Sequence, residues 1–215
     1  MSGAGRHPVR LVVFDLDGVL VDTQYAEDGG LLRLARRMGL TLGEEQAGVL
    51  FSGKRLATCI ELLERLAGRP APEDAVEFVR AECERILGPR IDPVDGAEEA
   101  LRRIKLTKCV ASNSPHDLIE RRLRASGLLD YFEDRLCSAY DVNAWKPDPG
   151  LFLSAAAEYE VPPSGCAVVE DSAVGVRAGV RAGMHVLQFT NGRAVAPHSH
   201  GVTTFAHMAQ LPGLI

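Results

Sequence analysis

The chain lacks the features that mark secreted, membrane and nucleic-acid-binding proteins. Its 215 residues carry a net charge of −5, whereas proteins that bind nucleic acid usually present a basic surface. No apolar run is long enough to span a membrane, and residues 1–10 lack the apolar core of a signal peptide. We therefore expect a cytoplasmic protein that binds neither nucleic acid nor a membrane.

Cysteines are few, and their spacing suggests no pairing. The five are widely scattered and contain no Cys-x-x-Cys pair: Cys59, Cys83, Cys109, Cys137 and Cys166. An odd number at such spacings indicates reduced thiols rather than a disulfide framework or a zinc site. The hydrophobic fraction of 46% and the charged fraction of 25% are typical of an ordinary globular protein, which we expect to be a monomer.

Apolar, strand-like runs alternate with helical patterns over most of the chain. We expect strands over 10–14, 109–111, 135–138, 166–169, 185–189 and 202–205. Expected helices lie between them, over 96–104, after Ser114 and Pro115, after Asp148 and Pro149, and over 173–182. The alternation predicts an α/β fold: a Rossmann-like parallel sheet with helices on both faces.

One long segment after the first strand breaks this alternation. From residue 23 to about 88 the pattern is helical throughout, with expected helices that include 44–51 and 56–66, and another that starts at Pro72. This block is too long for a simple crossover between strands. We predict an inserted all-helical cap domain over 23–94 and a catalytic core made of 9–22 and 95–215.

Polar side chains follow the predicted strands at the edge where parallel sheets bind their ligands. Asp15 and Asp17 come first, and residues i and i+2 of a strand point to the same face, about 6.6–7 Å apart. Two close carboxylates repel each other, so they need a cation or a shared proton. The other strand ends carry Ser112, Asn113, Lys146, Glu170 and Asp171.

Each of these residues also has a purely structural interpretation. Asp-x-Asp-Gly is a common turn, Ser114 before Pro115 is a plausible helix N-cap, and an acidic pair suits the start of a helix. A single lysine such as Lys146 usually lies at the surface. The joint pattern is harder to explain in this way, because every strand end offers a group that phosphoryl transfer needs.

The combination resembles the haloacid dehalogenase-like hydrolase superfamily. Residues 15–22 are similar to its first motif, Ser112 with Asn113 to the second, Lys146 with Pro147 to the third, and residues 170–175 to the fourth. The helical insertion after Asp22 resembles the cap of the β-phosphoglucomutase-like branch. Segments 53–56, 139–149 and 202–208 resemble the 6-phosphogluconate phosphatase-like subgroup, which implies a small phosphorylated sugar or sugar acid as substrate.

The resemblance also implies roles for the strand-end residues. Asp15 would attack phosphorus and form an aspartyl-phosphate, and Asp17 would act as general acid and then general base. Mg²⁺ would be held by Asp15, Asp171 and the backbone carbonyl of Asp17, and by Glu170 either directly or through water. Ser112, Asn113 and Lys146 would bind the phosphoryl oxygens.

Two other functions are alternatives to a phosphatase: a phosphomutase and a non-catalytic signalling domain. The β-phosphoglucomutase pattern has His where this chain has Glu27 and Arg where it has Leu56, so both departures favour hydrolysis. Lys54 and Arg55 are candidate substrate contacts, the alternative being a solvated helix start. A non-catalytic phospho-acceptor signalling domain is disfavoured, because such domains place the acidic pair and the phospho-acceptor on different strands and lack so large an insertion.

Overall fold

The computed structural model describes residues 8–51, 54–193 and 201–215. The chain divides into two units, Met1–Val21 with Asp92–Ile215 and Asp22–Ile91. These divisions fall slightly before the predicted boundaries at 22/23 and 94/95. Residues 52–53 and 194–200, which belong to the predicted cap and core, lie outside the described residues.

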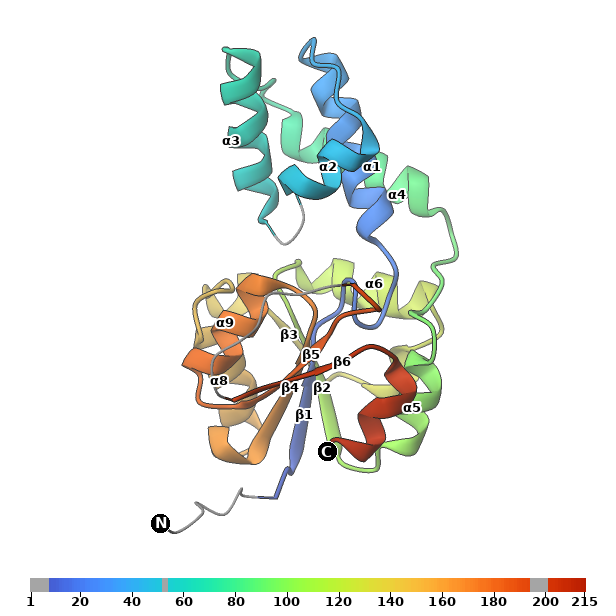
Figure 1. Ribbon diagram of the computed structural model, residues 1–215, viewed down its shortest axis with the longest axis vertical. Helices are drawn as coiled ribbons and strands as arrows, with labels where there is room; N and C mark the ends of the chain where they lie inside the picture. Colours follow the sequence, from blue (N-terminus) through green and yellow to red (C-terminus); the bar gives the residue numbers. More distant parts are fainter. Residues whose placement is uncertain (1–7, 52–53, 194–200) are drawn as a thin grey trace. The chain divides into compact units, whose positions relative to one another are not determined.

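The larger unit is built on a sheet of six parallel strands among the described residues. The spatial order is β3-β2-β1-β4-β5-β6 (Figure 1), so that β1 lies between β2 and β4. The strands are β1 Leu11–Phe14, β2 Thr107–Ser112, β3 Leu136–Ser138, β4 Cys166–Glu170, β5 His185–Phe189 and β6 Val202–Phe205. The predicted α/β fold with a parallel sheet is confirmed.

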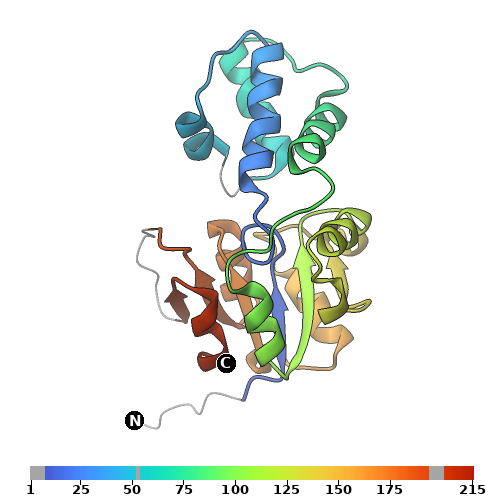
Figure 2. The ribbon, with the colours of Figure 1, turned by 90° about the vertical axis from the view of Figure 1, so that its right-hand side faces the viewer.

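Helices cover both faces of this sheet. Helices α8 (Gly150–Glu158) and α9 (Ala173–Arg181) lie on one face, and α5 (Ala97–Arg103) and α6 (His116–Ala125) lie on the other (Figures 1 and 2). A short helix, α7, spans Ala139–Val142. Short 3₁₀ helices lie at η1 Leu129–Tyr131, η2 Pro163–Gly165 and η3 Met208–Gly213.

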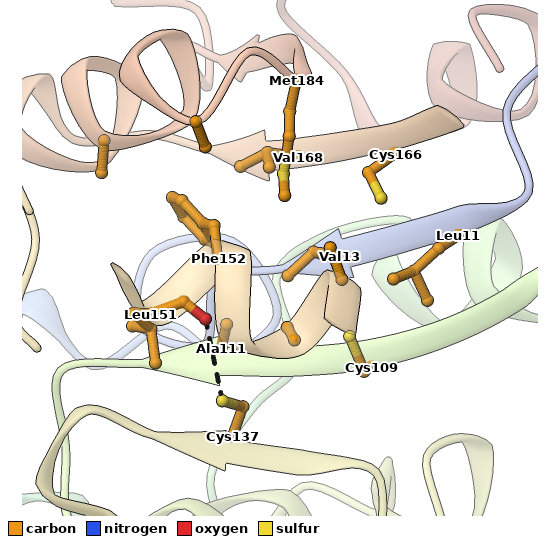
Figure 3. Packing of buried hydrophobic residues seen from close by; sticks show 14 of the residues in the cluster. Leu11, Val13, Cys109, Ala111, Cys137, Leu151, Phe152, Cys166, Val168 and Met184 are labelled. Atoms are coloured by element: carbon orange, nitrogen blue, oxygen red, sulfur yellow. Dashed lines mark hydrogen bonds between the residues drawn. The ribbon is translucent and has the colours of Figure 1, made fainter. Parts of the chain in front are cut away.

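The apolar core forms on both sides of the central strands. Leu11 and Val13 of β1 pack in a buried cluster with Phe152 of α8 (Figure 3). Phe14 of the same strand makes an edge-to-face contact with Phe132, their ring centroids 5.9 Å apart. Burial on both faces explains why these strands read as continuous apolar runs instead of alternating with polar residues.

The five cysteines contribute to these cores rather than to cross-links. All five lie in the described part of the chain, and all are buried and free of disulfides. Cys137, for example, places its thiol 3.8 Å from the carbonyl oxygen of Leu151 (Figure 3). The interpretation of the cysteines as reduced thiols therefore agrees with the structure.

Outside residues 52–53, the smaller unit consists of four helices with their own apolar core. They are α1 Gln24–Arg37, α2 Glu44–Phe51, α3 Leu56–Ala67 and α4 Ala75–Leu87. Leu34, Leu63 and Val79 are among the buried residues of this core. Gly30 allows α1 and α4 to approach closely, since a Cβ atom there would come within 2.9 Å of the Val79 carbonyl oxygen. Among the described residues, no helix is both long and apolar enough to cross a membrane.

Candidate active site

The candidate site lies at the carboxyl ends of three neighbouring strands of the larger unit. Phe14, the last residue of β1, is in register with Val110 of β2 and with Val169 of β4. Asp15 follows directly, and its backbone N–H donates to the Val169 carbonyl at 2.9 Å. Parallel register therefore brings Asp15, Ser112 and Glu170 to one edge of the sheet, as the sequence predicted.

Three carboxylates gather at this edge. One oxygen from each of Asp15, Glu170 and Asp171 lies within 4.8 Å of the others, and Glu170 is fully buried. Such a cluster is unfavourable without positive charge, because burial and mutual repulsion both oppose ionisation. The arrangement is one that could hold a metal ion.

Lys146 supplies one positive charge to the cluster. Its ammonium nitrogen lies 2.6 Å from Asp15 Oδ1 and 2.6 Å from Glu170 Oε1, and its side chain is only 3% exposed. Burial by itself lowers the pKa of this ammonium, but Asp15 and Glu170 outweigh that effect, so the pKa of Lys146 is raised. Lys146 is therefore a charged residue of the site and not a surface lysine.

Glu170 is held on both of its oxygens. Oε1 accepts from Lys146, and Oε2 accepts from the backbone N–H of Ser172 at 3.1 Å and from its hydroxyl at 2.9 Å. Ser172 also caps α9, because its hydroxyl accepts from the Gly175 N–H. With both oxygens engaged inside the protein, Glu170 is placed to fix Lys146.

The two remaining carboxyl groups of the cluster resist ionisation. Burial, followed by the charge of Glu170, raises the pKa of Asp15 well above its ordinary value despite the opposing effect of Lys146. The same causes in the same order raise the pKa of Asp171 to about 7. A cation bound between Asp15 and Asp171 would favour their ionised forms.

The Asp17 carboxylate pairs with a helix and not with Lys146. The strand ends at Phe14, and residues 16–21 form a tight turn in which Gly18 N–H donates to the Val21 carbonyl at 2.8 Å. Gly18 adopts a φ of 82°, and a Cβ atom there would lie 2.4 Å from Asp171 Oδ2. The i, i+2 spacing of an extended strand therefore does not apply, and Asp17 Oδ1 pairs with Arg122 of α6 instead of joining the cluster.

Ser112 and Asn113 organise the loop after β2. The buried Ser112 hydroxyl accepts from the Ser114 N–H at 3.1 Å, and Asn113 Oδ1 accepts from the Lys146 N–H at 2.9 Å. The Asn113 side chain thus anchors the segment that carries Lys146. The expected N-cap role of Ser114 is wrong, because α6 begins at His116 with Pro115 as its N-cap.

Lys54 and Arg55 belong to the smaller unit. Both are exposed, and Arg55 stands as the N-cap residue of α3. The Lys54 ammonium donates to the Leu50 carbonyl at 2.6 Å. Their proposed contact with substrate stays a prediction.

Sequence reasoning missed one charged residue of the site, Arg122. It lies on the buried side of α6 beside Leu123 and one turn after Ile119, both fully buried. The available signal was an arginine at an apolar position of a helical pattern, which needs a buried partner.

A family model for haloacid dehalogenase-like hydrolases matches residues 9–183. The chain belongs to this family. The 6-phosphogluconate phosphatase of Escherichia coli is 34% identical over 208 residues, which cover 96% of this chain and 94% of that protein. The expectation of an enzyme of the hydrolase class, related to the 6-phosphogluconate phosphatase-like subgroup, is therefore confirmed.

Solved structures agree with this family and its fold. A conserved haloacid dehalogenase-like protein from Agrobacterium tumefaciens is 29% identical, with a TM-score of 0.81 over 96% of this chain and 97% of that chain. A β-phosphoglucomutase candidate from Thermotoga maritima is 23% identical, with a TM-score of 0.74 over 96% of this chain and 98% of that chain. The second likeness agrees with the fold and carries no argument about activity.

Proposed function

We propose that this hydrolase is a Mg²⁺-dependent phosphatase that acts on a small phosphorylated sugar or sugar acid through an aspartyl-phosphate on Asp15. The observation that carries the proposal is the contact of the buried Lys146 ammonium with both Asp15 and Glu170. This contact places the Asp15 carboxylate beside the Lys146 ammonium, and the Asp171 carboxylate lies at the same sheet edge. The relatedness to a 6-phosphogluconate phosphatase supports the substrate class.

Asp15 acts as the nucleophile in this proposal. It stands at the end of β1, where its backbone is anchored to Val169 and its carboxylate faces Lys146. Attack on phosphorus forms a bond from the carboxylate oxygen to phosphorus and breaks the bond to the leaving oxygen. Splitting the hydrolysis in this way replaces one difficult displacement by two easier ones.

Asp17 transfers the protons. It donates a proton to the leaving oxygen in the first step and accepts one from the attacking water in the second, which returns Asp15 to its free form. Ser112 and the Asn113 backbone N–H bind the phosphoryl oxygens, and Lys146 stabilises the charge that develops on them. Lys54 and Arg55 are the proposed contacts to the rest of the substrate.

The donors around Asp15 fit a hard divalent cation. Carboxylates of Asp15 and Asp171 are the kind of oxygen ligands that Mg²⁺ takes, and the Asp17 backbone carbonyl is the proposed third. Glu170 contributes through the charge it places beside them, or as a further ligand directly or through water. A bound Mg²⁺ would neutralise the clustered carboxylates and allow an anionic nucleophile to meet an anionic phosphate.

The proposal is tested by phosphate release from a panel of phosphorylated metabolites. The panel contains 6-phosphogluconate, sugar 1-phosphates, sugar 6-phosphates and nucleotides, assayed with Mg²⁺ and with a chelator. We expect Mg²⁺-dependent release that is fastest with a sugar or sugar-acid phosphate. Isomerisation of β-glucose 1-phosphate to the 6-phosphate without phosphate release would instead establish a mutase, and absence of turnover on the whole panel would refute the proposal.

A further inference from the structure

Arg122 is an internal arginine in contact with one carboxylate of the site. Its side chain is 4% exposed, and it lies in the last turn of α6 among apolar residues. Its Nη1 donates to Asp17 Oδ1. Arginine is almost never fully buried without a partner, since removing its charge from water is costly, so this contact is a built feature of the site.

The contact determines where the Asp17 carboxylate lies. With Oδ1 on Arg122, its second oxygen, Oδ2, lies 3.5 Å from the Ser114 hydroxyl, and the side chain keeps 22% of its surface exposed. Among the described residues, the acidic cluster that could hold a metal consists of Asp15, Glu170 and Asp171, without Asp17. The Asp17 side chain is thus drawn toward α6.

Two buried cations therefore hold three of the four neighbouring carboxylates, in two separate groups, and Asp171 is the fourth. Lys146 joins Asp15 to Glu170, and Arg122 holds Asp17. Without Arg122, the Asp17 carboxylate would be free to turn toward a cation bound by Asp15 and Asp171. It would then cease to be available to a leaving oxygen, because a proton carrier must lie within hydrogen-bond reach of the atom it serves.

We propose that Arg122 is a positioning residue that keeps the Asp17 carboxylate out of the metal set and at the place of the leaving oxygen. This inference rests on the proposed function, in which Asp17 protonates the leaving oxygen as its bond to phosphorus breaks. A planar guanidinium suits the task, since it fixes a carboxylate in orientation as well as in position. Arg122 itself does not touch the substrate.

The test separates positioning of a proton donor from a general structural role. An alkyl leaving group, as in a sugar phosphate, needs a proton as it departs, whereas p-nitrophenolate is stable without one. We therefore compare kcat/KM, which reports the step that expels the leaving group, for a sugar phosphate and for p-nitrophenyl phosphate. Arg122→Gln should lower kcat/KM about 100-fold for the sugar phosphate and less than about threefold for p-nitrophenyl phosphate.

Three further variants complete the experiment. Asp17→Asn should show the same contrast between substrates, and its combination with Arg122→Gln should add little, because both changes remove one function. Arg122→Lys keeps the charge and should recover part of the loss. Arg124→Gln is the matched control on the same helix, since Arg124 is 62% exposed and pairs with Glu120, and it should change neither substrate.

The outcomes distinguish the inference from the function on which it rests. An equal loss on both substrates in Arg122→Gln and Arg122→Lys, or no loss on either, would overturn the positioning role while the phosphatase proposal stands. If the wild-type protein releases phosphate from neither substrate, the proposed function fails and the inference fails with it. Thermal unfolding of each variant shows that the compared proteins are folded.

Discussion

Gly175 packs directly against Glu170, and the site leaves no room for a side chain at this position. A Cβ atom at this position would lie 1.8 Å from Glu170 Oε1, the oxygen that contacts Lys146. Any side chain at position 175 must therefore displace the glutamate or the start of α9. Glu170, which fixes the Lys146 ammonium, can keep its position only because residue 175 has no side chain.

We expect Gly175→Ala to destabilise the protein by about 1–3 kcal/mol, as overpacking of a filled interior does, and to lower phosphatase activity by displacing Glu170. Gly48→Ala is the matched control, because Gly48 lies inside α2 and a Cβ atom there would meet no other described part of the protein within 4 Å. That change should stabilise its helix by up to about 1 kcal/mol. Urea unfolding and phosphate release check both variants, and equal stability of the two would contradict the steric account.

Strands were predictable as elements, whereas the short turns around the site were not. The ranges expected for β5 and β6 match the structure to the residue, because both are short segments rich in β-branched and other apolar residues. The expected start of α6 at Ser114 was wrong, since the Ser114 N–H bonds back to Ser112 and Pro115 caps the helix. Helix α7, four residues long, gives too little periodicity to detect.

The pairing of charges across elements was equally out of reach of the sequence. Order along the chain places Asp15 and Glu170 at strand ends, and the parallel register of β1 and β4 brings them together, whereas Lys146 comes after α7 and reaches both through its side chain. Nothing in that order shows that Asp17 pairs with Arg122, because this depends on the turn over residues 16–21 and on the rotation of α6 that buries Arg122. Local sequence patterns indicate which face of a helix is buried and where a strand ends. Which charged residues of distant elements pair with each other is seen only in the packed structure.

At the scale of the whole molecule, stability without a cation should depend on the buried carboxyl groups. The pKa of Asp171 is about 7 in the folded state, above its ordinary value of 3.8, and that of Asp15 is also raised. The folded protein therefore binds these protons more tightly than the unfolded chain does. The contribution of Asp171 to stability is full below about pH 4 and is lost as the pH rises through about 7, and the contribution of Asp15 is likewise lost as that group ionises.

Added Mg²⁺ should reverse this loss. At pH 8, above the pKa of Asp171 of about 7, the cation displaces few protons from that carboxyl group, so a concentration about 100 times the Kd should stabilise the folded state by about 2.7 kcal/mol. At pH 5 the increase in Tm on adding Mg²⁺ should be smaller. Thermal unfolding with Mg²⁺ or a chelator at both pH values measures this, and Asp171→Asn should reduce the Mg²⁺ response. A larger response at pH 5 would contradict the assignment of the carboxyl cluster.

The most direct measurement of the central claim is the site of phosphoryl transfer during turnover. The enzyme is mixed with labelled substrate and Mg²⁺, quenched in acid within one turnover, and digested for mass spectrometry. The account predicts a phosphoryl adduct on the peptide that contains Asp15 in the wild-type protein, and no adduct in Asp15→Asn. An adduct on another residue, or an Asp15→Asn enzyme that releases phosphate at the wild-type rate, would contradict it.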